Sequence, residues 1–160
     1  MVIDGKEISK RDFAVVKFER ERICLPPHFA MRARLAGTTD IEFLLLVLAP
    51  GRYRFVRQPT ENAAGDLSVV LDHWERMGAE GNVFDGTDNN ARAAIRARLI
   101  PCTVSPPPPG WRISLPKEAM DLATGDRTRA FLLIVAGFVE VWFPDALRAA
   151  VSAPLSELMS

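Results

Sequence analysis

Arginine is the residue type whose clustering in this chain could do chemistry. The segment from Lys10 to Arg34 carries seven basic residues against three acidic ones. Guanidinium groups are planar and make paired hydrogen bonds to phosphates and to the edge of guanine. The segment therefore indicates a surface that could bind DNA. The alternative is that these arginines are solvated, or are neutralised by the acids Asp12, Glu19 and Glu21.

Two cysteines and two histidines form the other candidate group: Cys24, His28, His73 and Cys102. By number they could make a zinc site, and a cysteine beside a histidine could act as a nucleophile. Their spacing matches no zinc motif, and no phosphate loop, nucleophile elbow or carboxylate pair accompanies them. We therefore expect reduced thiols, no metal, no cofactor, no catalytic residues and no small-molecule substrate, and we predict that the protein is not an enzyme.

The overall composition is that of an ordinary globular protein. The chain has 160 residues, 48% of them hydrophobic, with 20 basic and 20 acidic residues. Zero net charge argues against a strongly electrostatic nucleic-acid binder, although a balanced total can conceal local patches. The charged N-terminus has no apolar signal region, and no apolar run is long enough for a membrane span. We expect a cytoplasmic protein of one domain, without a membrane partner.

A short pattern occurs twice in the chain and determines the expected elements. Residues 22–26 read RICLP and residues 112–116 read RISLP. Three further matches follow in the same order: Ala30-Met31 with Ala119-Met120, FLLLV from Phe43 with FLLIV from Phe131, and Gly51 with Gly137. An ordered set of matches at nearly constant offset indicates an internal repeat.

Each copy predicts two strands, a short helix and two more strands. In the first copy the strands are expected at 13–18, 20–25, 41–49 and 52–56, with a helix at 28–37 that ends at Gly37. The continuous apolar run at 41–49 predicts burial on both faces, whereas the alternation at 52–56 predicts a half-buried strand. The second copy predicts strands at 98–105, 111–115, 129–136 and 139–143, and helices at 117–125 and 144–151. Two connecting helices are expected at 66–78 and 91–99.

The repeated motifs resemble those of a known family. Residues 110–123, GWRISLPKEAMDLA, resemble the Gly-Arg-Ile-x-Leu-Pro pattern of the SpoVT/AbrB-like swapped-hairpin fold. Residues 139–151, VEVWFPDALRAAV, resemble its closing strand, turn and helix. Two such modules in one chain are similar to the MraZ family of bacterial transcriptional regulators. The resemblance runs from about Phe13 to Val151 and differs from the family's Asp-x-x-x-Arg signature, because Phe18 and Pro108 stand where the Asp would be.

The resemblance implies both a fold and a function. It implies a β-rich α+β protein, a tandem pseudo-twofold repeat of AbrB-like swapped-hairpin modules with connecting helices. The first module would span 13–58, the helical connector 59–99 and the second module 100–152. It also implies a MraZ-like transcriptional regulator that binds double-stranded DNA, associates with the nucleoid and forms a homo-oligomeric ring or dimer. The expected DNA-binding residues are Arg20, Arg22, Arg32, Arg34 and Arg112. The alternative is a scaffold or protein-interaction member of the same fold that does not bind DNA.

Overall fold

The computed structural model describes residues 1–33, 35, 43–57, 99–107 and 110–151. The expected connecting helices at 66–78 and 91–99 lie outside these residues, apart from Leu99, and so do the expected helix end at Gly37 and the tail after Val151. In the first half of the chain the strands are β1 Val2–Ile3, β2 Lys6–Glu7, β3 Phe13–Lys17, β4 Arg22–Cys24, β5 Phe43–Ala49 and β6 Arg52–Arg57. In the second half they are β7 Leu99–Ser105, β8 Arg112–Ser114, β9 Arg129–Val135 and β10 Phe138–Trp142. The helices are the short 3-10 helix η1 Lys10–Asp12 and the α-helices α1 Pro27–Arg32, α4 Lys117–Leu122 and α5 Pro144–Ala150.

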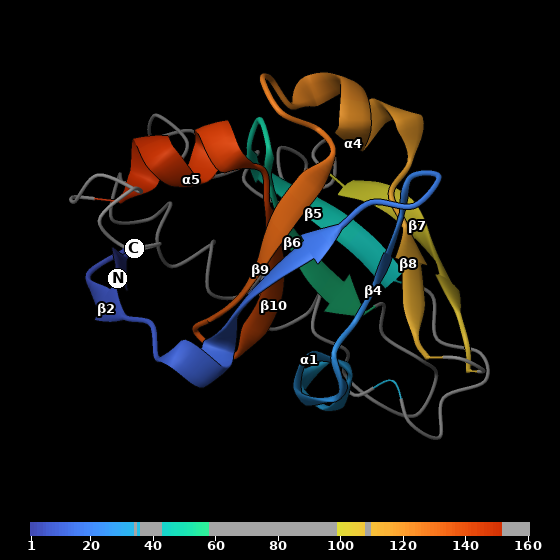
Figure 1. Cartoon of the computed structure of the whole chain (residues 1–160), viewed down its shortest axis with the longest axis horizontal. Helices are drawn as coiled ribbons and strands as arrows, with labels where there is room; N and C mark the ends of the chain where they lie inside the picture. The colour runs from blue at the N-terminus through green and yellow to red at the C-terminus, as the bar shows by residue number, and fades with distance from the viewer. Residues whose placement is uncertain (34, 36–42, 58–98, 108–109, 152–160) are drawn as a thin grey trace, which may run out of the picture.

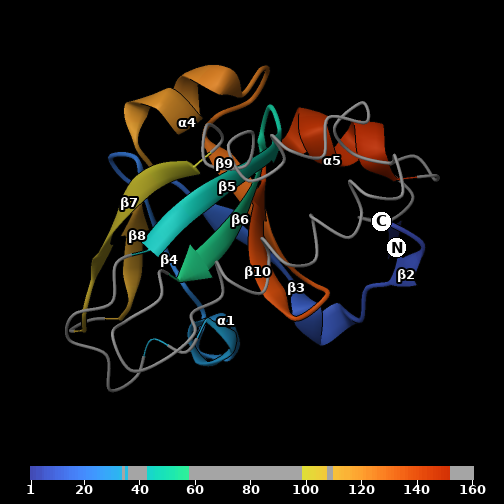
Figure 2. The same cartoon turned by 180° about the vertical axis from the view of Figure 1, so that it is seen from behind.

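The protein is β-rich, with a nearly closed antiparallel sheet of eight strands and few helices among its described residues. The order of the strands is β3-β9-β10-β6-β5-β7-β8-β4. Its two edge strands, β3 and β4, follow one another in the sequence. Figure 1 shows α4 and α5 near one end of the sheet and α1 near the other, and Figure 2 gives the view from behind. The sheet thus curls until its first and last strands approach each other.

Four of the strand pairs join the first part of the chain to the last part. They are β3 with β9, β4 with β8, β5 with β7 and β6 with β10. In the β4–β8 pair Ile23 lies opposite Ile113, and in the β6–β10 pair Arg54 lies opposite Glu140. Segments between about 50 and 120 residues apart in the sequence are therefore directly hydrogen-bonded neighbours.

Apolar side chains form a main core and two smaller clusters. The main core includes Ile23, Leu45, Tyr53, Ile113 and Phe143. A second cluster packs α5 and the β1–β2 hairpin against β9 and β10, and it contains Ile3, Phe131, Trp142 and Leu147. A third contains Leu44, Leu46 and Val56. Neighbouring residues of β5 thus belong to different clusters, which confirms the predicted burial on both faces for the stretch Phe43–Leu46.

The prediction that β6 is only half buried was wrong. Tyr53, Arg54, Phe55 and Val56 are all buried. The alternation in the sequence suggested that Arg54 faces solvent, but its guanidinium lies against the ring of Phe138, 4.8 Å from the centroid, and pairs with the carboxylate of Glu140. A charged residue can be buried when another charge compensates it.

Several element boundaries also differ from the predictions. Helix α1 ends at Arg32 and α4 at Leu122, so both are shorter than expected. The predicted strand at 20–25 begins only at Arg22, because Arg20 and Glu21 form a turn with positive φ. The β1–β2 hairpin and η1 were not predicted. Their charged sequence conceals one buried residue, Ile3, which anchors the hairpin in the second cluster.

Candidate functional site

Arg22 and Arg112 lie on the same face of the β4–β8 ribbon. Arg22 is paired with Ser114, and Cys24 with Arg112, so the two arginines are diagonal neighbours across the strands. The residues between them, Ile23 and Ile113, are each only 1% exposed and point into the main core. Because side chains alternate along a strand, both arginines must point away from the core.

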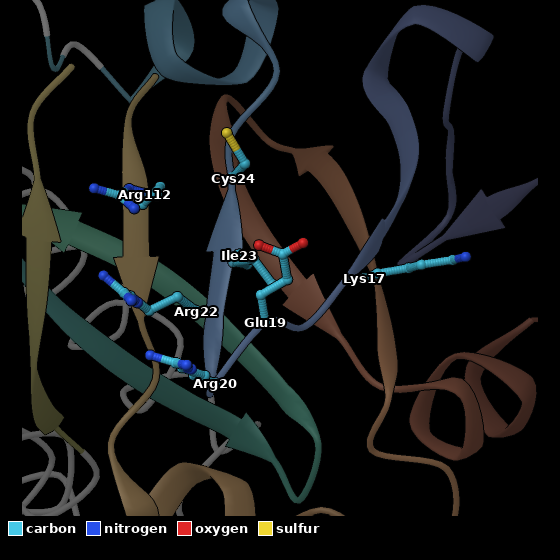
Figure 3. Close-up of a pocket in the computed structure, with 7 residues that line it drawn as sticks. All are labelled: Lys17, Glu19, Arg20, Arg22, Ile23, Cys24 and Arg112. Atoms are coloured by element: carbon cyan, nitrogen blue, oxygen red, sulfur yellow. The ribbon is translucent and has the colours of Figure 1, made fainter. Parts of the chain in front are cut away.

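Arg20 reaches the same surface from the turn that precedes β4. Arg20 and Glu21 have φ values of 52° and 64°. The amide of Glu19 donates to the carbonyl of Arg22 at 2.8 Å, and the amide of Arg22 donates to the carbonyl of Glu19 at 3.0 Å. This is the geometry of a two-residue hairpin turn of type I′. Figure 3 shows Arg20, Arg22 and Arg112 extending to one side of β4 and β8, so the turn brings Arg20 beside the other two.

These arginines line a pocket of about 580 Å³. It lies where the two edge strands β3 and β4 meet, and one residue of the neighbouring strand β8 contributes to it. Its lining residues are Lys17, Glu19, Arg20, Arg22, Ile23, Cys24 and Arg112. In Figure 3 Lys17 extends from β3 in the direction opposite to the arginines, and the Glu19 carboxylate lies on the far side of β4 from them. The arginine side of the pocket is therefore purely cationic.

Neither Glu19 nor Glu21 neutralises this cationic surface. Among the described residues, Arg20, Arg22 and Arg112 form no ion pair with any carboxylate. The Nε atom of Arg112 is buried and has no hydrogen-bond partner. Asp12, the third acid considered as a partner, instead pairs with His28 at 2.9 Å. Apart from this buried Nε, the guanidinium groups keep their donors for a ligand.

The two remaining predicted residues are not part of this group. Arg32 ends α1 and lies beside Phe43, Phe55 and the β9–β10 turn, away from the pocket. Arg34 lies outside the described residues. The structure therefore brings together three of the five predicted arginines.

Sequence reasoning missed the polar strand beside them. On β7, Thr103 is paired with Ser114 and Ser105 with Arg112, while Val104 between them faces Ile113 of the core. The hydroxyl groups of β7 consequently share the outer face of the ribbon with the arginines. The alternation in residues 102–105, CTVS, could have indicated this face, but only once the pairing with β8 was known.

The cysteines and histidines do not form a common site. Cys24 is exposed beside the arginines, whereas Cys102 packs against the main core. Burial raises the pKa of the Cys102 thiol to about 12. Within the part of the chain that the structure describes, no three His, Cys, Asp or Glu side chains are placed to hold a metal ion, and His73 lies outside that part.

A second group of arginines has a structural role. The Glu140 carboxylate is fully buried and pairs with Arg52 at 2.9 Å and with Arg54 at 2.6 Å. It also accepts a hydrogen bond from the indole of Trp142 at 3.0 Å. Arg52 reaches outward to Asp4 in the β1–β2 turn at 2.7 Å, which lowers the pKa of that carboxyl. This network ties the N-terminal hairpin to the sheet.

Comparison with family models, with curated proteins and with solved structures finds no match for this chain. None of the helices in the described ranges is both long and apolar enough to cross a membrane. The assignment of a function therefore depends on the geometry of the arginine surface.

Proposed function

We propose that this protein is a MraZ-like regulator that binds double-stranded DNA through the outer face of the β4–β8 ribbon. One observation carries the proposal: Arg20, Arg22 and Arg112 extend to the same side of the sheet, and none of them has an acidic partner among the described residues. A guanidinium without an acidic partner can donate two parallel hydrogen bonds to one phosphate. Arg22 and Arg112 also occupy the Arg positions of the signature in the family that the sequence resembles. Such a regulator would act in the cytoplasm, in association with the nucleoid.

The proposal includes a tandem pseudo-twofold repeat of swapped-hairpin modules. The strand pairs support it, because each strand of the first copy pairs with a strand of the second. The repeat makes Ile23 equivalent to Ile113, and these two residues face each other. Arg54 and Glu140 are likewise equivalent in the repeat, and they also lie opposite each other. Equivalent residues pair in this way when a twofold axis passes between them.

A scaffold without DNA binding is the second candidate. Phe18 stands where the family signature has Asp, and its ring stacks on Phe143 with centroids 5.4 Å apart. A packing residue at this position favours a member of the fold that retained its stability and changed its surface. The two candidates predict opposite behaviour on an anionic matrix.

Heparin retention and DNA binding at several salt concentrations separate the two candidates. We expect binding at low salt, with an affinity that falls as salt rises because bound counterions are released. Each lost phosphate contact should flatten the slope of log K against log salt by about one unit. Arg20→Ala combined with Arg22→Ala should weaken binding more than Arg112→Ala, because the first copy carries more positive charge.

Arg11→Ala is the matched control. Arg11 is exposed in η1 and does not line the pocket, so its loss should change binding little. Circular dichroism should show the same fold for all variants. If the wild-type protein is not retained on heparin even at low salt, the regulator proposal fails and the scaffold is favoured.

A further inference from the structure

The pocket beside β4 has the size of a small-ligand site. Its volume of about 580 Å³ lies within the range of roughly 300–1,000 Å³ that is typical of pockets for small molecules. A DNA duplex, by contrast, is contacted over roughly 1,000–2,500 Å² of protein surface. Contact with a duplex explains the arginines of the outer face but does not require a pocket at the junction of β3 and β4.

The charges of the lining indicate what such a ligand must carry. The three arginines supply three positive charges on one side of β4, whereas Lys17 and Glu19 extend to its other side. Each guanidinium has five hydrogen-bond donors and no acceptor. Arg22 and Arg112 are diagonal neighbours on the same face, so both side chains can reach a single ligand. A ligand with several adjacent anionic groups would compensate the charge, whereas one carboxylate would not.

The lining also indicates what the ligand does not need. Among the described lining residues only Ile23 and Cys24 are uncharged, and none of them has an aromatic ring. A nucleobase would find no aromatic surface on which to stack. Recognition would therefore be restricted to the phosphates.

We infer that this pocket binds a compact free polyphosphate through Arg20, Arg22 and Arg112. The pocket does not discriminate between nucleobases that are attached to the phosphates. Arg112 holds the ligand from β8, and Arg20 and Arg22 hold it from the turn and from β4. Since these residues also form the proposed DNA surface, polyphosphate and DNA compete. The competition rests on the proposed function, whereas the binding of polyphosphate does not.

The test uses inorganic tripolyphosphate as the probe, titrated into the full chain by calorimetry at constant ionic strength and without divalent metal. We expect saturable binding with one site per chain. Arg22→Ala and Arg112→Ala should each weaken it roughly tenfold, the usual effect of losing a charge-assisted hydrogen bond. Arg22→Lys should recover only part of the affinity because lysine lacks the paired geometry. Arg11→Ala should bind like the wild type, and ATP and GTP should bind with affinities similar to each other.

A second arm adds tripolyphosphate to the protein bound to a labelled DNA duplex. Release of DNA at concentrations that saturate the pocket supports the inference and the competition. If tripolyphosphate binds and DNA does not, the inference stands and the proposed function fails. If DNA binds and tripolyphosphate does not, or if the pocket variants bind tripolyphosphate as well as Arg11→Ala does, the inference is overturned and the proposed function is untouched.

Discussion

Arginines of this chain serve two different purposes, and their neighbours determine which. Arg52 and Arg54 form ion pairs with the buried carboxylate of Glu140, whereas Arg22 and Arg112 form no ion pair with a carboxylate among the described residues. A guanidinium can leave water only where an opposite charge and hydrogen bonds replace the solvent. Residue type alone cannot separate the two purposes, because the deciding partner of Arg54 lies 86 residues away in the sequence.

We predict that Glu140→Gln destabilises the fold strongly. The substitution removes the negative charge from between two arginines and leaves Arg54 buried without compensation. Breaking a buried ion pair from one side costs about 3–5 kcal/mol of unfolding free energy. Urea denaturation measures this loss, and Glu118→Gln in the exposed first turn of α4 is the control, with an expected effect of less than about 1 kcal/mol. Equal effects of the two substitutions would contradict a role for the network in stability.

The two cysteines should differ in reactivity. Cys24 is exposed, while burial raises the pKa of the Cys102 thiol to about 12, so Cys102 holds almost no reactive thiolate at pH 8. Iodoacetamide should therefore add once to the native protein, on Cys24, and twice in denaturant, as intact mass can show. The same shift predicts a loss of stability above about pH 9, where the thiol ionises in the unfolded chain but stays protonated in the folded one. Equally rapid labelling of both thiols would contradict the burial of Cys102.

At the scale of elements, the two turns that contain Gly51 and Gly137 differ in their contact with helix α5. Gly51 follows β5 with a φ of 85°, and Gly137 follows β9 with a φ of 84°. A Cβ atom at Gly51 would lie 3.2 Å from the Cβ of Ala146 in α5, whereas one at Gly137 would meet nothing within 4 Å. The backbone of the first turn also accepts a hydrogen bond at 2.8 Å from the amide of Phe143, directly before α5. The two glycines therefore share a positive φ but differ in their surroundings.

This difference makes Gly137→Ala the control for Gly51→Ala. Both substitutions place a side chain in left-handed backbone, which costs about 1–2 kcal/mol. Gly51→Ala should cost roughly 1–3 kcal/mol more, because it also overpacks the contact with α5. Thermal or urea unfolding of the two variants measures the difference. If Gly137→Ala proved the more damaging, α5 would not be packed against the β5–β6 turn.

The sequence predicted the strands better than their arrangement. Continuous apolar runs and β-branched residues identified β5 and β9 because such residues pack well in buried sheets. Two features could not be predicted. The turn at Arg20 and Glu21 has no glycine to indicate a positive φ, so it read as strand. The pocket requires the meeting of β3, β4 and β8, and no local pattern specifies pairing across about 90 residues.

For the whole molecule, the two edge strands predict association between copies. An unpaired edge offers hydrogen-bonding groups to another strand, and Val15 on β3 is 48% exposed. We expect a native mass greater than the 17.7 kDa of one chain. Val15→Lys should lower that mass, because lysine on an edge opposes strand addition, while Met31→Lys on α1 should not. Size-exclusion chromatography with light scattering measures the native mass. A wild-type mass of one chain at micromolar concentration would contradict the prediction.

The pairing of β3 with β9 and of β4 with β8 also has a consequence for synthesis on the ribosome. When residues 13–57 have emerged, each of their four strands still lacks a neighbour that lies after residue 98. Among the described strands of this segment, β5 and β6 are the pair that can form a hairpin ladder early, and an isolated hairpin is marginal in water. The nascent chain must therefore carry exposed apolar strands until β9 and β10 have been made. Closure of such distant contacts is slow, and apolar strands that stay exposed during this time favour aggregation.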